Sequence, residues 1–231
     1  MSFQKQQIQT DIIDNVISIQ KATLDNNNFT KILEYLNVFL DIHQSIDSED
    51  RELIKLWNDI VADIIGVIHT GISGFYRLAM ISLRSILEMA CSSFYYYDHR
   101  IEYFMFLEHD SIADKYVTSL VNDYQFFKTN YIQYFADDIG EIEKQKNAVS
   151  EKLVLIYKNQ CDVVHGRYKK LLNSEALNIE YNEISFKKFE KMFIETMSII
   201  ALMYVLRFNV RDNITLLELA EFTKVVKFNG K

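Results

Sequence analysis

The fold is decided by residues 74–97, which read GFYRLAMISLRSILEMACSSFYYY. Apolar side chains recur there at spacings of three and four residues, and no proline or internal glycine interrupts them. This pattern predicts one long helix. Apolar residues cover most of the helix circumference, so we expect the helix to lie in the middle of a helical core.

A polar stripe follows one side of this central helix. It consists of Arg77 and, at offsets of seven, eleven, fourteen and eighteen residues, Arg84, Glu88, Cys91 and Tyr95. A buried charge destabilises a protein by several kcal/mol unless it is paired or hydrogen-bonded. Arg84 and Glu88 therefore need partners, and we expect these partners around His165.

The composition favours an all-α chain. Proline is absent and glycine occurs six times among 231 residues, which argues against a turn-rich β-sandwich and against a glycine loop for phosphate. We predict a multi-helix bundle in which the central helix packs on a second long helix, at about residues 141–172. We expect an N-terminal helical hairpin, residues 1–46, packed on a core domain, residues 47–231.

Charge and hydropathy restrict the class of protein. The formal charge of −7 argues against broad electrostatic binding of nucleic acid, although a local basic patch is compatible with it. The N-terminus has no apolar segment typical of a secretory signal, and the longest apolar run, residues 199–206, is too short to span a bilayer. Two cysteines fit a reducing compartment. We expect a cytoplasmic protein without a membrane partner.

Further helices are predicted from periodicity and capping residues. The pair Gly71 and Gly74 is expected to join the third helix to the central one as an antiparallel hairpin. Gly166 falls inside the predicted helix 141–172, where it favours a kink or a close helix contact. Ser185 is expected to cap the last long helix. The predicted helices are 8–24, 29–42, 111–135, 185–206 and 213–222, together with a third helix that begins at residue 47 or 48 and ends near residue 68. A loop is expected at residues 45–48.

A second polar stripe lies on the helix predicted at residues 141–172. Its members fall on one side of that helix and are Lys158, Cys161, Asp162, His165 and Lys169. Asp162 precedes His165 by one turn and is placed to hold its imidazole. If this helix packs against Arg84 and Glu88, the charges of both stripes are satisfied together. The same residues also fit a purely structural network between two core helices.

These two stripes carry a resemblance to a known family. LRSILE, residues 83–88, followed by Val164-His165-Gly166 late in a long helix, resembles the HEPN-type domains. These are all-α modules common in bacterial antiphage and toxin systems, and the resemblance covers about residues 60–207. It implies a metal-independent ribonuclease without a cofactor, with RNA as substrate, a homodimer that composes the site, and a partner protein from the same operon.

Carried onto this chain, the resemblance makes His165 the group that moves the proton of an attacking ribose 2′-hydroxyl. Lys158 takes the place of the family arginine, and it lacks the planar fork that grips phosphate at two points. Asp162 would orient the imidazole. The full candidate site comprises the catalytic residues His165, Lys158, Asp162, Arg84 and Glu88 and the phosphate-binding residues Arg167 and Arg77. The alternative is a non-catalytic interaction or sensor module in which Arg84, Glu88, Asp162 and His165 are structural.

Two other kinds of site fit the sequence less well. Cys91, Cys161, Asp162 and His165 would meet at a metal ion if the two helices pack as expected, but the chain has no Cys-x-x-Cys spacing and no second histidine nearby. We therefore expect no metal. Lys187, Lys188 and Lys191 fit either a phosphate contact or a solvated helix face.

Overall fold

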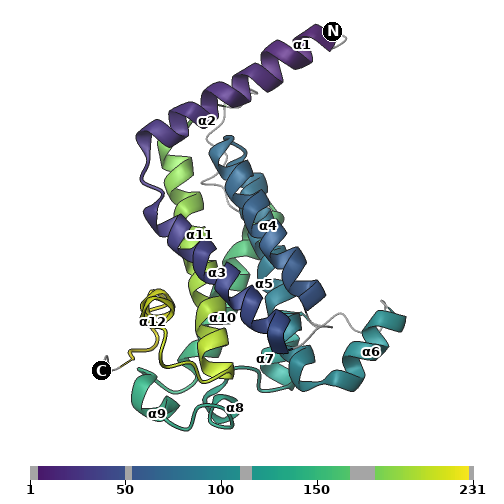
Figure 1. Cartoon of the computed structure of the whole chain (residues 1–231), viewed down its shortest axis with the longest axis vertical. Helices are drawn as coiled ribbons and strands as arrows, with labels where there is room; N and C mark the ends of the chain where they lie inside the picture. Colours follow the sequence, from purple (N-terminus) through teal and green to yellow (C-terminus); the bar gives the residue numbers. More distant parts are fainter. Residues whose placement is uncertain (1–4, 50–53, 110–115, 167–179, 229–231) are drawn as a thin grey trace.

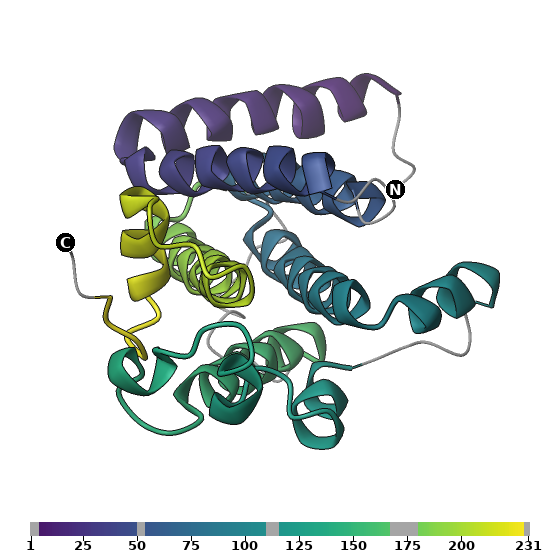
Figure 2. The same ribbon diagram turned by 60° about the horizontal axis from the view of Figure 1, so that its bottom comes forward.

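The computed structural model describes residues 5–49, 54–109, 116–166 and 180–228. These residues form an all-α multi-helix bundle, as the sequence predicts, and their one strand-like pairing is an isolated antiparallel bridge between Glu143 and Val226. Figure 2 shows three layers: the N-terminal helices with α4, then α5 beside α11, then α10 with the short helices α7 to α9.

The N-terminal segment is one continuous helical rod that leans away from the bundle (Figure 1). It comprises α1 (Lys5–Gln7), the π-helical segment η1 (Ile8–Asp14) and α2 (Asn15–Asn26). α3 (Thr30–Glu49) follows and packs on α4 and α11. The loop expected at residues 45–48 is wrong, because Ile42 and Ile46 continue the buried face of α3 by a further turn. α3 thus crosses the expected domain boundary at residue 46, and the division into two domains stays a prediction.

The predicted antiparallel hairpin is formed by α4 (Ile54–Ile72) and α5 (Tyr76–Asp98). Gly74 has a φ of +83°, a left-handed conformation that glycine adopts without strain, and this allows the reversal between the two helices. α5 contacts α4, α10 and α11, so it is the central helix that the sequence predicts.

α11 (Glu183–Arg207) lies beside α5 and is the most deeply buried helix, since every residue from 196 to 206 is buried. Asn182, and not Ser185, caps it, because the Asn182 side chain accepts a hydrogen bond from the Ser185 backbone N–H at 2.8 Å. α12 (Ile214–Glu221) follows with Asn213 as its cap. The chain then returns to the α9–α10 turn, where the Lys227 N–H donates to the Ile142 carbonyl at 2.9 Å.

Between α5 and α11 the sequence predicts two helices, at 111–135 and 141–172, whereas the described residues form several shorter ones: α6 (Arg100–Glu108), α7 (Val117–Asp123), α8 (Thr129–Ile132), α9 (Ile139–Ile142) and α10 (Ala148–Val164). The single helix expected at 111–135 is wrong over its described part, residues 116–135, because Gln125 and Phe127 adopt left-handed conformations that interrupt the helix after α7. Residues 111–115 lie outside the described residues.

The helix predicted at 141–172 is shortened at both ends. Asn147, with a φ of +63°, separates α9 from α10. Gly166 does not kink a helix interior but ends α10, because its φ of +65° reverses the backbone and its N–H donates to the Val163 carbonyl at 3.2 Å. Residues 167–172 lie outside the described residues.

Candidate functional site

The polar stripe of α5 meets α10 at a hydrogen-bonded cluster of Arg84, Glu88 and Tyr157. The Arg84 guanidinium donates to Glu88 Oε1 through Nη2 at 3.0 Å and Nε at 3.1 Å. The Tyr157 hydroxyl, on α10, donates to the same oxygen at 2.8 Å. Arg84 also donates to the Tyr157 hydroxyl at 3.2 Å. We call this group the Arg84 cluster. Its member from another helix is Tyr157, which is a partner for both Arg84 and Glu88.

The electrostatics of the Arg84 cluster keep the Arg84 guanidinium charged and the Tyr157 phenol neutral. Burial lowers the pKa of the Arg84 guanidinium, but the hydrogen bond and the charge of Glu88 raise it further than burial lowers it. Burial raises the pKa of the Tyr157 phenol, and its hydrogen bond to Glu88 raises it further. Neither group changes protonation near neutral pH, so the Arg84 cluster is fitted to hold two helices together and not to transfer protons.

The remaining predicted site residues lie outside this cluster. His165 follows the last residue of α10 and is exposed, and within the described residues no hydrogen bond joins it to the half-buried Asp162. The contact by which Asp162 would orient His165 is therefore not formed in this structure, in which α10 ends at Val164, and the catalytic roles of both residues stay a prediction. Lys158 and Arg77 are exposed. Arg167, the other phosphate-binding candidate, and Lys169 of the second stripe lie outside the described residues.

The metal alternative is not supported by the positions of its four candidate ligands. Across the described ranges, which include all four, no group of three or more His, Cys, Asp or Glu side chains is placed to hold a metal ion. Cys91 is completely buried, and this burial raises the pKa of its thiol. A deeply buried neutral thiol is a poor nucleophile.

The most buried ion pair of the described residues joins Arg207, at the end of α11, to Asp98, at the end of α5, and the sequence pattern did not indicate it. Both side chains are 14% exposed. The guanidinium donates to Asp98 Oδ1 from Nε at 2.9 Å and also from Nη2, while the Tyr131 hydroxyl donates to Asp98 Oδ2 at 2.6 Å. Three aromatic rings surround the Arg207 cation, and their centroids lie 4.0 to 5.4 Å from the guanidinium carbon Cζ: Phe135, Tyr97 and Phe208. The available signal was an arginine that directly ends an apolar helix and precedes an aromatic residue.

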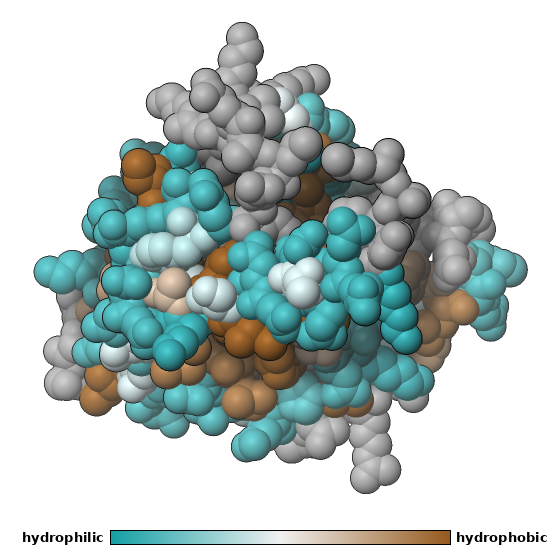
Figure 3. Space-filling model, turned by 90° about the horizontal axis from the view of Figure 1, so that it is seen from above, coloured by the Kyte–Doolittle hydropathy of each residue, from teal (hydrophilic) through white to brown (hydrophobic). Residues whose placement is uncertain are grey.

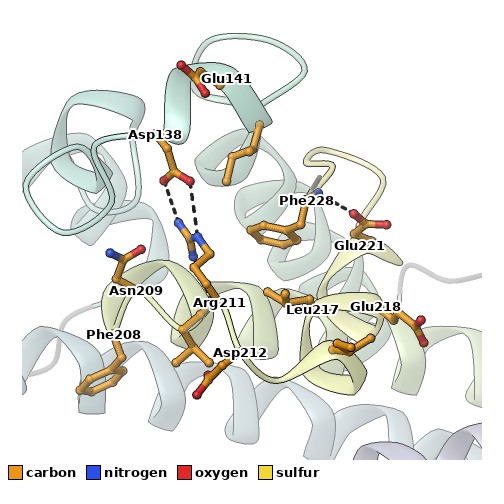
Figure 4. A pocket seen from close by; sticks show the side chains of 13 residues that line it. Asp138, Glu141, Phe208, Asn209, Arg211, Asp212, Leu217, Glu218, Glu221 and Phe228 are labelled. Atoms are coloured by element: carbon orange, nitrogen blue, oxygen red, sulfur yellow. Dashed lines mark hydrogen bonds and ion pairs between the residues drawn. The ribbon is translucent and has the colours of Figure 1, made fainter. Parts of the chain in front are cut away.

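A groove that the sequence analysis also missed runs along the loop between α11 and α12. A cavity of about 1120 Å³ lies between this loop, α9, α12 and the C-terminal segment (Figure 4). A second cavity of about 650 Å³ extends from the same loop toward α3. Phe208, Val210, Asp212 and Ile214 line both cavities, so we treat the two as one groove and call it the α12 groove.

Comparison of the chain with models of known protein families found no match, and comparisons with curated proteins and with solved structures found none either. The resemblance to HEPN-type domains therefore depends only on the residues that carry it. Among the described helices, none combines the length and the hydropathy that crossing a membrane requires.

Proposed function

We propose that this chain is a non-catalytic helical interaction module, of the kind that serves bacterial defence or toxin systems as sensor or partner. The observation that carries the proposal is the closed Arg84 cluster, in which Arg84, Glu88 and Tyr157 satisfy one another. A catalytic cation must be free to meet the charge that develops in the transition state. The Arg84 guanidinium is instead committed to Glu88, and no carboxylate in the described part of the chain orients His165.

Exposed apolar surface supports binding of another protein. α6 contacts α5 at its base and projects from the bundle, as Figure 1 shows, and its Ile101 and Phe104 are 79% and 54% exposed. The N-terminal rod exposes Ile8, Ile12, Ile13 and Ile17. Figure 3, which views the molecule from the end where α1 lies, shows apolar residues gathered among hydrophilic ones. Apolar side chains exposed in groups are typical of protein interaction sites.

A second candidate function is the metal-independent ribonuclease. The observation that favours it is that Lys158, on α10, and His165, which directly follows α10, are both exposed and lie seven residues apart. In this version a homodimer brings two such surfaces together around RNA, and His165 moves the proton of the attacking hydroxyl.

One experiment separates the two functions. The purified protein is incubated with a panel of structured and single-stranded RNAs in the presence of EDTA, beside a His165→Ala variant, and its oligomeric state is measured by light scattering. The interaction module predicts intact RNA for both proteins and equal thermal stability, since the His165 side chain is exposed. Cleavage by the parent protein that disappears in His165→Ala, while the fold persists, would overturn the proposal in favour of the nuclease.

A further inference from the structure

The α12 groove has an apolar floor that is already formed in this structure. Side chains from three separate parts of the chain provide it, and Figure 4 shows Leu217 of α12 and Phe228 of the C-terminal segment turned toward the same space. Ile214 lies where the two cavities meet, and 67% of its surface is exposed. A preformed apolar concavity binds apolar side chains without first having to rearrange.

The rim of the groove is acidic. Its only cation among the lining residues is Arg211, which donates to Asp138 at 2.8 Å and is therefore already neutralised. Glu221 accepts a hydrogen bond from the Phe228 N–H. Four further carboxylates among the lining residues have no hydrogen bond or ion pair to the described residues and are exposed: Glu141, Asp212 and Glu218 and, in the smaller cavity, Asp41. The rim therefore presents uncompensated negative charge around the apolar floor.

We propose that the α12 groove binds a segment of a partner protein in which apolar side chains are flanked by lysine or arginine. Apolar side chains would fill the floor, while the cations would reach Glu141, Asp212 and Glu218, giving charge complementarity and orientation. The larger cavity alone, at about 1120 Å³, exceeds the usual size of a small-molecule site and suits a peptide segment. The negative rim disfavours RNA and phosphorylated ligands, because like charges repel. This inference deepens the proposed interaction-module function and rests on it.

The probe is a fluorescein-labelled amphipathic peptide of leucine and lysine, compared with a peptide of the same pattern in which glutamate replaces lysine. Binding to the 231-residue chain is measured by fluorescence anisotropy. We expect the lysine peptide to bind, with an affinity that falls as salt is raised, and the glutamate peptide not to bind. Neutralising the rim with Glu141→Gln, Asp212→Asn and Glu218→Gln should weaken binding about tenfold, since each exposed pair contributes modestly.

Two matched controls distinguish the groove from general attraction to an acidic protein. The triple variant Asp25→Asn, Asp59→Asn, Asp63→Asn removes the same charge from exposed positions outside the groove and should leave the affinity within about twofold. Ile214→Ser should weaken binding, whereas Ile184→Ser, which changes a side chain with a similar exposure of 65% outside the groove, should not.

Equal loss of affinity in the rim and control triple variants, no effect of Ile214→Ser, or binding of the glutamate peptide would each overturn the groove proposal. Absence of binding by the lysine peptide would do the same. The interaction-module function is tested separately, by RNA cleavage. A peptide-binding result that overturns the groove proposal can therefore be told apart from a cleavage result that overturns the interaction-module function.

Discussion

Removing the Asp98 carboxylate should destabilise the bundle more than any other loss of a single charge that we can identify in the described residues. Asp98→Ala leaves the Arg207 guanidinium without its anion among three aromatic rings, and it removes the acceptor of the Tyr131 hydroxyl. Breaking a buried ion pair from one side destabilises by about 3 to 5 kcal/mol. The 14% exposure of both side chains places this pair at the lower end of that range.

One opposing effect reduces the expected value. Asp98 is the last residue of α5, where the helix dipole disfavours a negative charge by about 0.5 kcal/mol, so its removal relieves that penalty. We therefore expect Asp98→Ala to lower the free energy of unfolding by about 2 to 3 kcal/mol. The measurement is urea unfolding followed by far-UV circular dichroism, with the slope of the transition checked for two-state behaviour.

Two comparisons test the reasoning behind this value. Asp98→Leu combined with Arg207→Met removes both charges and should be less destabilising than Asp98→Ala, because no unpaired charge remains buried. Glu190→Ala breaks the more exposed Lys187–Glu190 pair and should change stability by about 0.5 kcal/mol or less. If Asp98→Ala costs no more than Glu190→Ala, or if the double variant is the least stable of all, the assignment of Asp98 and Arg207 as a buried stabilising pair is refuted.

Two further predictions concern packing and alkaline pH. Gly71→Ala places a methyl group against the buried Phe189 ring and should destabilise by about 1 to 3 kcal/mol, while Gly66→Ala, in the same helix with open space around it, should stabilise by up to about 1 kcal/mol; both are measured by thermal unfolding. Burial raises the pKa of five tyrosines, so above about pH 10 the unfolded state loses their protons while the folded state keeps them, and stability should fall as pH rises. The five tyrosines are Tyr35, Tyr76, Tyr95, Tyr131 and Tyr157. An absorbance titration at alkaline pH should show that they ionise only when the protein unfolds. Ionisation of all tyrosines while the protein is still folded would contradict this prediction.

The central helix and its hairpin with α4 were predictable because a continuous apolar period of three and four leaves few alternatives. The same period failed in the helix predicted at 111–135, over the part from residue 116 onward that the structure describes. Its tyrosines and phenylalanines repeat at helical spacing, yet Gln125 and Phe127 are left-handed and the rings of Phe126, Phe127 and Tyr131 pack on one another. Aromatic contacts between short segments can therefore reproduce the pattern of one amphipathic helix, and periodicity does not distinguish the two cases.

The candidate site was predictable in part, for a related reason. A central helix with Arg84 and Glu88 requires partners, and the structure provides one from α10. That partner is Tyr157, a residue that a sequence pattern counts with the apolar face of its helix, and not Asp162 or His165. A tyrosine has an apolar ring and a polar hydroxyl, and only coordinates reveal which part is used. The groove depends on residues far apart in the chain, which periodicity does not bring together.

The return of the C-terminal segment to the α9–α10 turn has a practical consequence for finding the partner. The Lys227 N–H and the Val225 carbonyl attach this segment to residues 142 and 144, and Phe228 enters the wall of the groove directly afterwards. A candidate peptide attached through a short flexible linker after Phe228 would begin close to its binding site and reach a local concentration of about millimolar. Such tethering would reveal sequences whose affinity is too weak to detect when the two molecules are mixed.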